Sequence, residues 1–589
     1  MTAKVISLNI KPGIQRDGTQ FDAPVYVDGK WVRFQRGRPR KIGGYRGIFQ
    51  NASGISRGMI MSSEDGLNYV YSGWSGGLEE WVTDDDDGVG SGPTTISLSD
   101  FTVDPLNLWQ MDIGFDSGGS GNQTLIAHPG LNLAHIDNTL NTPVLIGDFP
   151  TGAMSQVGVF TAAGTMVIGP PSVFTIASVN ALIAVGQTVT GTGVPANTTV
   201  SIVVVGASST TVTLSNTVST SGALTLTFNN NISVSGGCVM LHPYLFVYGN
   251  NGLIKNCSAG NFQDWVSADS NENTVSAGKI VKGLPVRGGT TAPSGLFWSL
   301  DSLIRVSYAP TTVGASTIYW RYDIVTSQSS ILSSSSVIEY DGLYFWCGVD
   351  RFLMYNGIVS EVANNTNINY FFDNVNYAQR QKVWATKIPR WGEIWWFYPK
   401  GDATECTDAI IYNVRDKVWY DAGEALGSRR AAGTFSEVFR RPIWAGTETN
   451  DSGTYTLWQH ETGTNLVNLS QQSAIQSYFE TDSIGWVNGG PNQNDAVGMN
   501  NYIRLERVEP DFVQSEDMNL YVTGKGYASD VDQVSDAYVF SPTTLKIDLR
   551  EQRREMRLRF ESNIVNGNYE CGLNLLSADV GDMRSTGNP

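Results

Sequence analysis

A recurring pair of apolar, aromatic runs constrains the fold of this chain more than any other feature. One copy reads YVYSGWSGGLEEWV (Tyr69–Val82): an aromatic run, a polar and glycine-containing turn, then a second run. Two such runs joined by a turn of this kind are typical of a β-hairpin. Seven copies occur, at Tyr69–Val82, Leu125–Asp137, Tyr244–Asn256, Leu296–Tyr308, Gly342–Gly357, Glu393–Asp421 and Pro442–Glu461. With one exception they start about 50 residues apart, which is close to the blade period of β-propellers.

This spacing predicts a β-propeller-like body of six or seven blades, with some irregularity. The composition agrees, since only 16% of residues are charged and the chain contains 63 glycines. A chain rich in glycine and aromatic residues and poor in charge favours short strands joined by tight turns over helices. Unrelated hairpins placed in β-sandwiches are the alternative interpretation.

The exceptional interval contains a segment without charge. No Asp, Glu, Lys or Arg occurs from Phe149 to Ile254. Within it, valine, isoleucine and leucine alternate with threonine and serine, as in half-buried strands, and VPANTT and GASS mark turns. We predict a small β-domain inserted between two blades, serving as decoration, a protein contact or a plain spacer.

The C-terminal part has a different pattern. Segments such as NYIRLERVEPDFV and MRLRFESN alternate apolar and charged residues, as expected for antiparallel strands with one wet face. The whole chain is therefore predicted to be all-β. Its four regions are an N-terminal extended segment (1–50), a β-propeller (51–469), the inserted uncharged β-domain (157–231) and a C-terminal β-sandwich (470–589).

The charge balance limits the kind of partner. The formal net charge is −17, whereas a protein that reads nucleic-acid sequence needs basic surface to displace counterions. No apolar run is long enough for a membrane span, and the start of the chain does not have the pattern of a secretory signal. Five scattered cysteines form no CxxC pair, which favours synthesis in a reducing cytoplasm.

The sequence contains no specific motif for chemistry, since GISRG (Gly54–Gly58) matches GxSxG only formally and lacks the following helix. The chain has four histidines, no HExxH motif and no GxxxxGK[ST] phosphate loop. Four consecutive carboxylates, Asp84, Asp85, Asp86 and Asp87, could collect Ca²⁺, but the EF-hand spacing is missing and an exposed acidic turn is favoured. We therefore expect no enzyme, with no catalytic, cofactor-binding or metal-binding residues. A glycoside hydrolase built on the propeller is an alternative.

Two basic segments stand out against the acidic total, at Lys30–Arg46 and Leu549–Phe560. In an acidic chain such strips are candidates for docking to acidic neighbours, and a strand face paired within the chain is the alternative. The candidate interface residues are Arg33, Arg36, Arg38, Arg40, Lys41, Arg553, Arg554 and Arg557.

The first basic segment also carries a resemblance. VDGKWVRFQRGRPRKIGGYRG (Val27–Gly47) resembles the N-terminal segment of the tail nozzle or tail hub proteins of short-tailed (podovirus) bacteriophages, also called packaged-DNA stabilisation proteins. The hairpins that follow, and the arginine-rich strands at Tyr502–Val508 and Leu549–Phe560, are similar to that family as well. The resemblance covers most of the chain except the uncharged segment.

The resemblance implies a structural virion protein in the phage tail, assembled in the host bacterial cytoplasm. Such proteins form a homo-oligomeric ring, usually a hexamer, below the portal and its adaptor protein. The ring retains the genome and then conducts it during DNA ejection. A needle or gate closes it, and tail fibres or tailspikes attach outside.

An acidic lumen, with Asp84–Asp87 as candidates, would repel phosphates, so that DNA passes without sequence-specific binding. A receptor-binding tail adhesin is the alternative role.

Overall fold

The computed structural model describes residues 4–583 with internal gaps. The gaps are 20–23, 65, 84–90, 97–107, 116–122, 129–133, 138–141, 146–158, 181–182, 184–186, 230–233, 263, 266, 288–291, 315, 486–500 and 528. The acidic run Asp84–Asp87 therefore lies outside the described residues. Contacts divide the chain into two compact units. We call Asn51–Glu361 the central unit, and Met1–Gln50 together with Val362–Pro589 the terminal unit.

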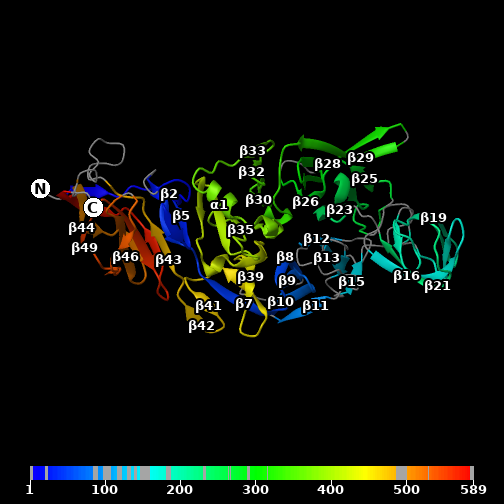
Figure 1. Cartoon of the computed structure of the whole chain (residues 1–589), viewed down its shortest axis with the longest axis horizontal. Helices are drawn as coiled ribbons and strands as arrows, with labels where there is room; N and C mark the ends of the chain where they lie inside the picture. Colours follow the sequence, from blue (N-terminus) through cyan, green and yellow to red (C-terminus); the bar gives the residue numbers. More distant parts are fainter. Residues whose placement is uncertain are drawn as a thin grey trace. The chain divides into compact units, whose positions relative to one another are not determined.

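The central unit contains five four-stranded antiparallel sheets, in each of which every strand pairs with the next along the chain (Figure 1). Sheet 1 consists of β8 (Ser56–Glu64), β9 (Leu67–Trp74), β10 (Gly77–Thr83) and β11 (Ser91–Ile96), and sheet 2 of β12 (Gln110–Phe115), β13 (Gln123–His128), β14 (Ala134–Asp137) and β15 (Thr142–Leu145). Sheet 3 consists of β22 (Gly237–Leu241), β23 (Tyr244–Tyr248), β24 (Leu253–Asn256) and β25 (Asn271–Thr274). Sheet 4 consists of β26 (Ile280–Pro285), β27 (Ser294–Ser299), β28 (Leu303–Val313) and β29 (Ser316–Thr326), and sheet 5 of β30 (Ile338–Tyr340), β31 (Leu343–Cys347), β32 (Phe352–Tyr355) and β33 (Val359–Glu361).

A sixth sheet of the central unit is formed by the uncharged segment. Its six strands follow the order β18-β21-β16-β17-β20-β19. The strands are β16 (Val159–Val167), β17 (Val173–Ile176), β18 (Thr188–Thr190), β19 (Val200–Val205), β20 (Thr210–Leu214) and β21 (Gly222–Asn229). Their apolar side chains form a separate core that includes Phe174, Val212 and Phe228, each fully buried. The chain thus inserts a small β-domain between sheets 2 and 3, as the alternation of valine and threonine predicts.

Two further blade-like sheets belong to the terminal unit. Sheet 6 consists of β34 (Trp384–Ile388), β35 (Glu393–Tyr398), β36 (Asp408–Asn413) and β37 (Val418–Asp421). Sheet 7 has the order β38-β39-β40-β7-β41-β42, with β38 (Arg430–Thr434), β39 (Ile443–Thr449), β40 (Tyr455–His460), β41 (Leu466–Asn468) and β42 (Gln471–Ser473). Its fourth strand, β7 (Tyr45–Ala52), comes from near the start of the chain. In Figure 1 the blue β7 lies among these yellow strands.

The seven predicted hairpins are confirmed. Each forms two neighbouring inner strands of one of these seven sheets, as β9 and β10 do through the register Trp74↔Gly77 to Asn68↔Thr83. The remaining six are paired in the same way. The chain is therefore all-β and propeller-like, with five blade-like sheets in the central unit and two in the terminal unit.

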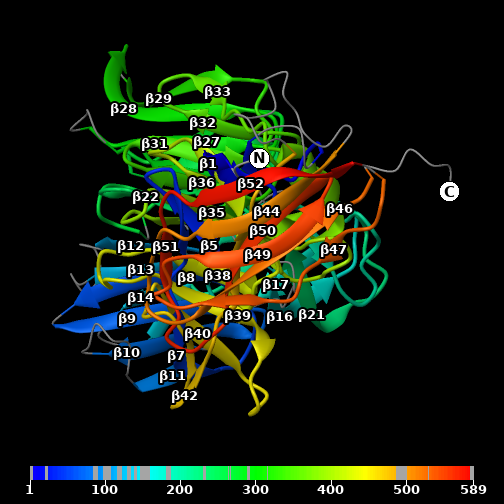
Figure 2. The same ribbon diagram turned by 90° about the vertical axis from the view of Figure 1, so that its left-hand side faces the viewer.

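The C-terminal part of the terminal unit is a β-sandwich to which the N-terminus contributes strands (Figure 2). One sheet has the order β1-β52-β44-β49, a second β4-β43-β50-β46-β47 with β48 also on β46, and a third β45-β51-β6-β5. The early strands are β1 (Lys4–Ser7), β2 (Lys11–Ile14), β3 (Val25–Tyr26), β4 (Asp28–Lys30), β5 (Val32–Gln35) and β6 (Arg38–Lys41). The late strands are β43 (Ser477–Glu480), β44 (Asn501–Glu509), β45 (Phe512–Gln514), β46 (Met518–Lys525), β47 (Gln533–Val534), β48 (Tyr538–Phe540), β49 (Ile547–Arg553), β50 (Glu555–Ser562), β51 (Tyr569–Cys571) and β52 (Leu575–Met583).

The N-terminal segment, expected to be extended over residues 1–50, forms short strands, several of which join the sandwich. β1 pairs with β52, β4 with β43 and β6 with β51, while β2 and β3 pair in parallel with each other. One continuous core of the terminal unit joins Trp31 of the N-terminal segment, Trp395 and Trp444 of sheets 6 and 7, and Phe560 of the sandwich. The sandwich is complete only with strands from both ends of the chain.

Helices are few and short in the described part. They are α1 (Ile368–Asn374) and the 3-10 turns η1 (Asn250–Gly252), η2 (Ser334–Ser336), η3 (Tyr377–Lys382) and η4 (Leu426–Ser428). No helix in this part is long and apolar enough to cross a membrane. All five cysteines are buried, and none forms a disulfide.

Buried histidines make the stability of the fold sensitive to acid. Burial lowers the pKa of His128 to about 4, although the ring donates from Nε2 to the carbonyl of Val234 at 2.8 Å. His460, beside Arg430, has its pKa lowered by burial and by that guanidinium. A histidine whose pKa is depressed in the folded state binds a proton more readily when unfolded. Stability is therefore lost as the pH falls through the interval between the unfolded and the folded pKa.

We expect the lowered pKa of His128 to reduce the free energy of unfolding of the wild-type protein by about 2 kcal/mol when the pH falls from 7 to 4.5. Replacing His128 with glutamine should reduce this pH dependence, as measured by urea unfolding at the two pH values. The exposed His242→Gln variant serves as the matched control and should keep the wild-type pH dependence. An equal acid sensitivity in His128→Gln and wild type would contradict the assignment.

Candidate functional site

The basic segment near the N-terminus forms a tight hairpin. β5 and β6 pair from Val32↔Lys41 to Gln35↔Arg38. The turn places Arg36 at φ 51° and Gly37 at φ 76°, both in the left-handed region that closes a two-residue hairpin. Arg36 is exposed at the tip. The hairpin therefore presents its charge at one end and buries its base.

Arg33 on β5 is fully buried, at 0% exposure. Its guanidinium lies 2.9 Å from a carboxylate oxygen of Glu393 and 2.7 Å from one of Glu461, and over the ring of Trp391 at 4.7 Å. Burial alone would lower the pKa of Arg33, but the two carboxylates outweigh it and the pKa is raised. Arg33 joins the hairpin to sheets 6 and 7, so its prediction as an interface residue is wrong.

Lys41 has an internal role as well. It is 3% exposed, and its Nζ donates to the carbonyl of Gly567 at 2.7 Å. Burial lowers the pKa of Lys41 to about 8. Lys41 thus ties β6 to the loop before β51 and offers no charge to a partner, which corrects its prediction as an interface residue.

Arg38 and Arg40, by contrast, are only partly buried. Arg38 donates to the carbonyl of Gly572 at 3.3 Å, and Arg40 pairs with the half-exposed Glu570 at 3.2 Å. Exposed pairs of this kind contribute little to stability. Both guanidinium groups remain available to a docking partner.

Two turns of sheet 6 add positive charge beside the hairpin. The side chain of Gln35 donates to the carbonyl of Trp391 at 3.1 Å, which places the hairpin turn against the β34–β35 turn. Arg40 and Arg390 both lie over the Trp391 ring, each at 4.9 Å. Arg415, in the β36–β37 turn, donates to the carbonyls of Pro389 at 2.6 Å and Arg390 at 3.1 Å.

Together these side chains form one surface of the terminal unit. We call it the basic patch; its members are Arg36, Arg38, Arg40, Arg390 and Arg415. Arg390 and Arg415 were missed by sequence reasoning because neither belongs to a dense run of basic residues; each has a single lysine within three positions, Lys387 and Lys417. Arginine over a half-buried tryptophan such as Trp391 is a combination found at protein interfaces.

The second basic strip is paired within the chain. Arg553 lies 2.9 Å from Glu551 and Arg554 lies 3.0 Å from Glu555. Arg557 is 5% exposed and contacts both Glu480, at 2.6 Å, and Asp532, at 2.7 Å. The alternative of an internally paired strand face is therefore the one observed, and the assignment of Arg557 to an interface is wrong.

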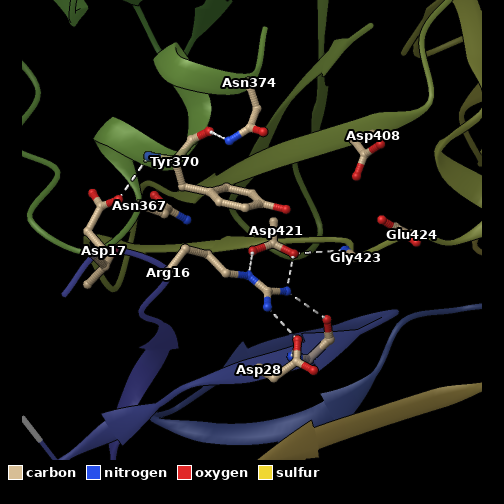
Figure 3. A network of polar contacts seen from close by, with 12 residues as sticks. Arg16, Asp17, Asp28, Asn367, Tyr370, Asn374, Asp408, Asp421, Gly423 and Glu424 are labelled. Carbon is tan, nitrogen blue, oxygen red and sulfur yellow. Dashed lines mark hydrogen bonds and ion pairs between the residues drawn. The ribbon is translucent and has the colours of Figure 1, made fainter. Parts of the chain in front are cut away.

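A second polar network was not predicted from the sequence (Figure 3). The Arg16 guanidinium donates to both carboxylate oxygens of Asp421, at 2.8 and 2.9 Å, and also contacts Asp28. Its cationic carbon lies 5.6 Å from the centre of the Tyr370 ring. Burial would lower the pKa of Arg16, but Asp421 and Asp28 outweigh it, and the pKa is raised. This network fastens the N-terminal segment to β37 of sheet 6.

Asp17 continues the same connection. Its carboxylate accepts hydrogen bonds from the backbone N–H groups of Asn369, at 2.9 Å, and Tyr370, at 2.8 Å, in the first turn of α1. Carboxylates are favourable at this end of a helix. An isolated Arg-Asp pair has no periodicity in the sequence, so no pattern could have shown that residues 16 and 17 contact residues about 350 to 400 positions later.

The described residues contain no group of three or more His, Cys, Asp or Glu side chains placed to hold a metal ion. The contacts around the hairpin base (Arg33 and Lys41) and the network around Arg16 instead pair each buried cation with carboxylates and carbonyls. Chemically, the arrangement can hold strands together and can present the basic patch on a rigid support.

Comparison with known proteins gives little guidance. No protein-family profile matches the chain, and no curated protein matches it. Among solved structures, the chain is similar to BBS1N in a crystal structure of BBS1N in complex with ARL6DN. The identity is 9%, the alignment covers 70% of this chain and 97% of that chain, and the TM-score is 0.33. A similarity this distant supports no argument about function.

Proposed function

We propose that this chain is a structural component of a short-tailed phage tail, the nozzle, and that it acts without catalysis. Copies associate side by side into a closed ring, with six as the number that the family resemblance implies. The ring lies below the portal-adaptor protein, carries tail fibres or tailspikes, and retains and then conducts the genome. It is located in the virion tail after assembly in the host cytoplasm.

The observation that carries this proposal is the basic patch on an acidic chain. Three exposed arginines, Arg36, Arg390 and Arg415, project from turns, while the chain as a whole has a net charge of −17. Opposite charges on two docking surfaces favour association and fix its orientation. Contacts between two different surfaces of identical chains generate rings when the rotation closes. We assign the patch to the contact with an acidic surface of the next subunit in the ring.

The buried networks support the same role. The patch rests on a hairpin whose base is fixed by Arg33, and the segment before it is fixed by Arg16. A surface held in one conformation binds with a smaller loss of entropy than a mobile one. Acidic surface elsewhere on the chain would repel phosphates, so that DNA slides through a ring instead of binding to it.

Charge reversal in the basic patch tests the proposal. We expect the variant Arg36→Glu/Arg390→Glu/Arg415→Glu to remain folded and to lose ring assembly, as measured by native mass spectrometry and electron microscopy of the full-length protein. The matched control is Arg504→Glu/Lys546→Glu/Arg550→Glu, which makes the same change in net charge at exposed positions of the sandwich. Rings of wild-type size from the patch variant would contradict the assignment, and so would an equal loss from the control.

A further inference from the structure

A cavity of about 380 Å³ lies in the central unit, where three segments meet. Leu300 and Asp301 come from the turn between β27 and β28, and Asp350 and Arg351 from the turn between β31 and β32. The connection that follows β29 supplies Gln328 and neighbouring serines. The volume is at the lower end of the range of about 300–1,000 Å³ that is typical of ligand sites.

Backbone hydrogen bonds fix the three segments relative to one another. The N–H of Ser329 donates to the carbonyl of Asp301 at 3.0 Å, which ties the connection to the first turn. On the other side, the Ser330 hydroxyl accepts from the N–H of Val349 at 3.0 Å, and Trp346 donates to the Ser330 carbonyl at 3.0 Å. The walls of the cavity are therefore largely pre-formed.

Donors and acceptors alternate around this cavity. Asp301 accepts from the Ser299 hydroxyl at 2.7 Å. Asp350 and Arg351 form a two-pronged contact, with both distances at 3.1 Å, and their side chains are 63% and 50% exposed. Gln328 is exposed and can donate and accept. Leu300, 49% exposed, adds an apolar surface beside these polar groups.

One polar group at the wall of the cavity has no hydrogen-bond partner. The hydroxyl of Ser329, a residue that is 1% exposed, has none within the described chain. A buried polar group without a partner costs free energy and requires an explanation in a native structure. This hydroxyl has almost no accessible surface, so the groups that the cavity offers to a ligand are the exposed side chains of Asp301, Gln328, Asp350 and Arg351.

We propose that this cavity binds one or two sugar rings of a saccharide. The hydroxyls of a sugar can donate to Asp301 and Asp350 and accept from Arg351 and Gln328, and the C–H face of the ring can pack on Leu300. Two carboxylates disfavour an anion, and Arg351 disfavours a metal cation. This inference goes beyond the structural role, because it gives the central unit a glycan-binding activity of its own.

Saturation-transfer NMR of the full-length protein tests the proposal. The probes are D-glucose, D-galactose, D-mannose, L-rhamnose and N-acetyl-D-glucosamine, each at millimolar concentration. We expect at least one of them to receive saturation from the wild-type protein in the presence of EDTA. Asp301→Asn and Arg351→Ala should each weaken that binding about tenfold or more, because each removes a charged hydrogen-bonding group.

The matched control is Arg321→Ala. Arg321 forms a similarly exposed pair with Asp323 on β29 of the same sheet 4, at 2.9 Å, but does not line the cavity. The Arg321→Ala variant should bind the sugar as the wild type does. If none of the five sugars receives saturation, the proposal is overturned. Transfer that EDTA abolishes, or transfer that survives unchanged in both cavity variants, would also overturn it.

Discussion

Replacing Arg33 with alanine is expected to lower the free energy of unfolding by about 3–5 kcal/mol. The reason lies in what the substitution leaves behind. Glu393 is fully buried and Glu461 nearly so, and Arg33 is the cation that contacts both. Burial alone would raise the pKa of Glu461, but Arg33 outweighs it, and the pKa of that carboxyl is lowered. Without Arg33, two buried carboxylates lose the cation that they share and, among the described residues, keep only hydrogen bonds from Trp391, Trp395 and Tyr420.

Urea unfolding followed by tryptophan fluorescence measures the effect. Arg36→Ala, three residues away and exposed, is the matched control and should change stability by no more than about 0.5 kcal/mol. The triple variant Arg33→Met/Glu393→Gln/Glu461→Gln should recover most of the loss, because uncharged groups of similar volume avoid the desolvation of three ions. An Arg33→Ala midpoint equal to that of the wild type would show that the triad contributes nothing to stability.

Replacing Arg16 with alanine is expected to cost about 3 kcal/mol, the low end of the range for buried ion pairs. This cost is smaller than that of Arg33→Ala because the side chains of Arg16 and Asp28 are partly exposed, to 16% and 31%. Asp421, 7% exposed, would lose its bidentate partner. Arg16→Lys should recover only part of the loss, since an ammonium group cannot reproduce the two parallel hydrogen bonds.

A double-mutant cycle with Asp421→Ala isolates this interaction. We expect the two single substitutions to be strongly non-additive, with a coupling energy of about 1–3 kcal/mol. Limited proteolysis gives a second readout, because loosening of the first 30 residues should expose them to cleavage before the sandwich unfolds. Additive single substitutions would contradict the role of Arg16 as the fastener of the N-terminal segment.

The hairpins and the insert could be predicted because their signals are local. Aromatic runs such as Glu393–Tyr398 pair with a neighbour a few residues away, and the alternation of valine and threonine in Thr210–Leu214 directly reports one buried face. The register of such pairs is set by the turn and by the buried face. Local pattern and observed structure therefore agree for these elements.

The pairing of the two chain ends could not be predicted in this way. β1 pairs with β52 across more than 560 residues, and neither strand carries a signal that names its partner. The basic candidates show the same difficulty. Arg33 and Arg36 look alike in the sequence, but one meets Glu393 and Glu461 in the core while the other is exposed at the hairpin tip. Only the tertiary arrangement distinguishes a buried arginine from a docking arginine.

The segment 367–385, NINYFFDNVNYAQRQKVWA, shows a smaller difference of the same kind, because its sequence alone favours one helical segment over its whole length. Its apolar residues do begin a helix, but α1 ends at Asn374, and η3 and the start of β34 follow. Val375 is extended, and its N–H still donates to the carbonyl of Phe371. Packing of Trp384 against Trp444 and Phe397 in the core requires a strand there. Tertiary packing here overrides the local preference.

Cryo-electron microscopy of the full-length protein, alone and on particles that carry it, tests the central claim most directly. The structural role predicts a closed ring with an axial channel, lying on the portal axis and built from one chain repeated by rotation. The basic patch should lie at a contact with an acidic surface. Monomers at all concentrations, or trimers at the periphery of the particle, would contradict the nozzle assignment and would favour a receptor-binding adhesin.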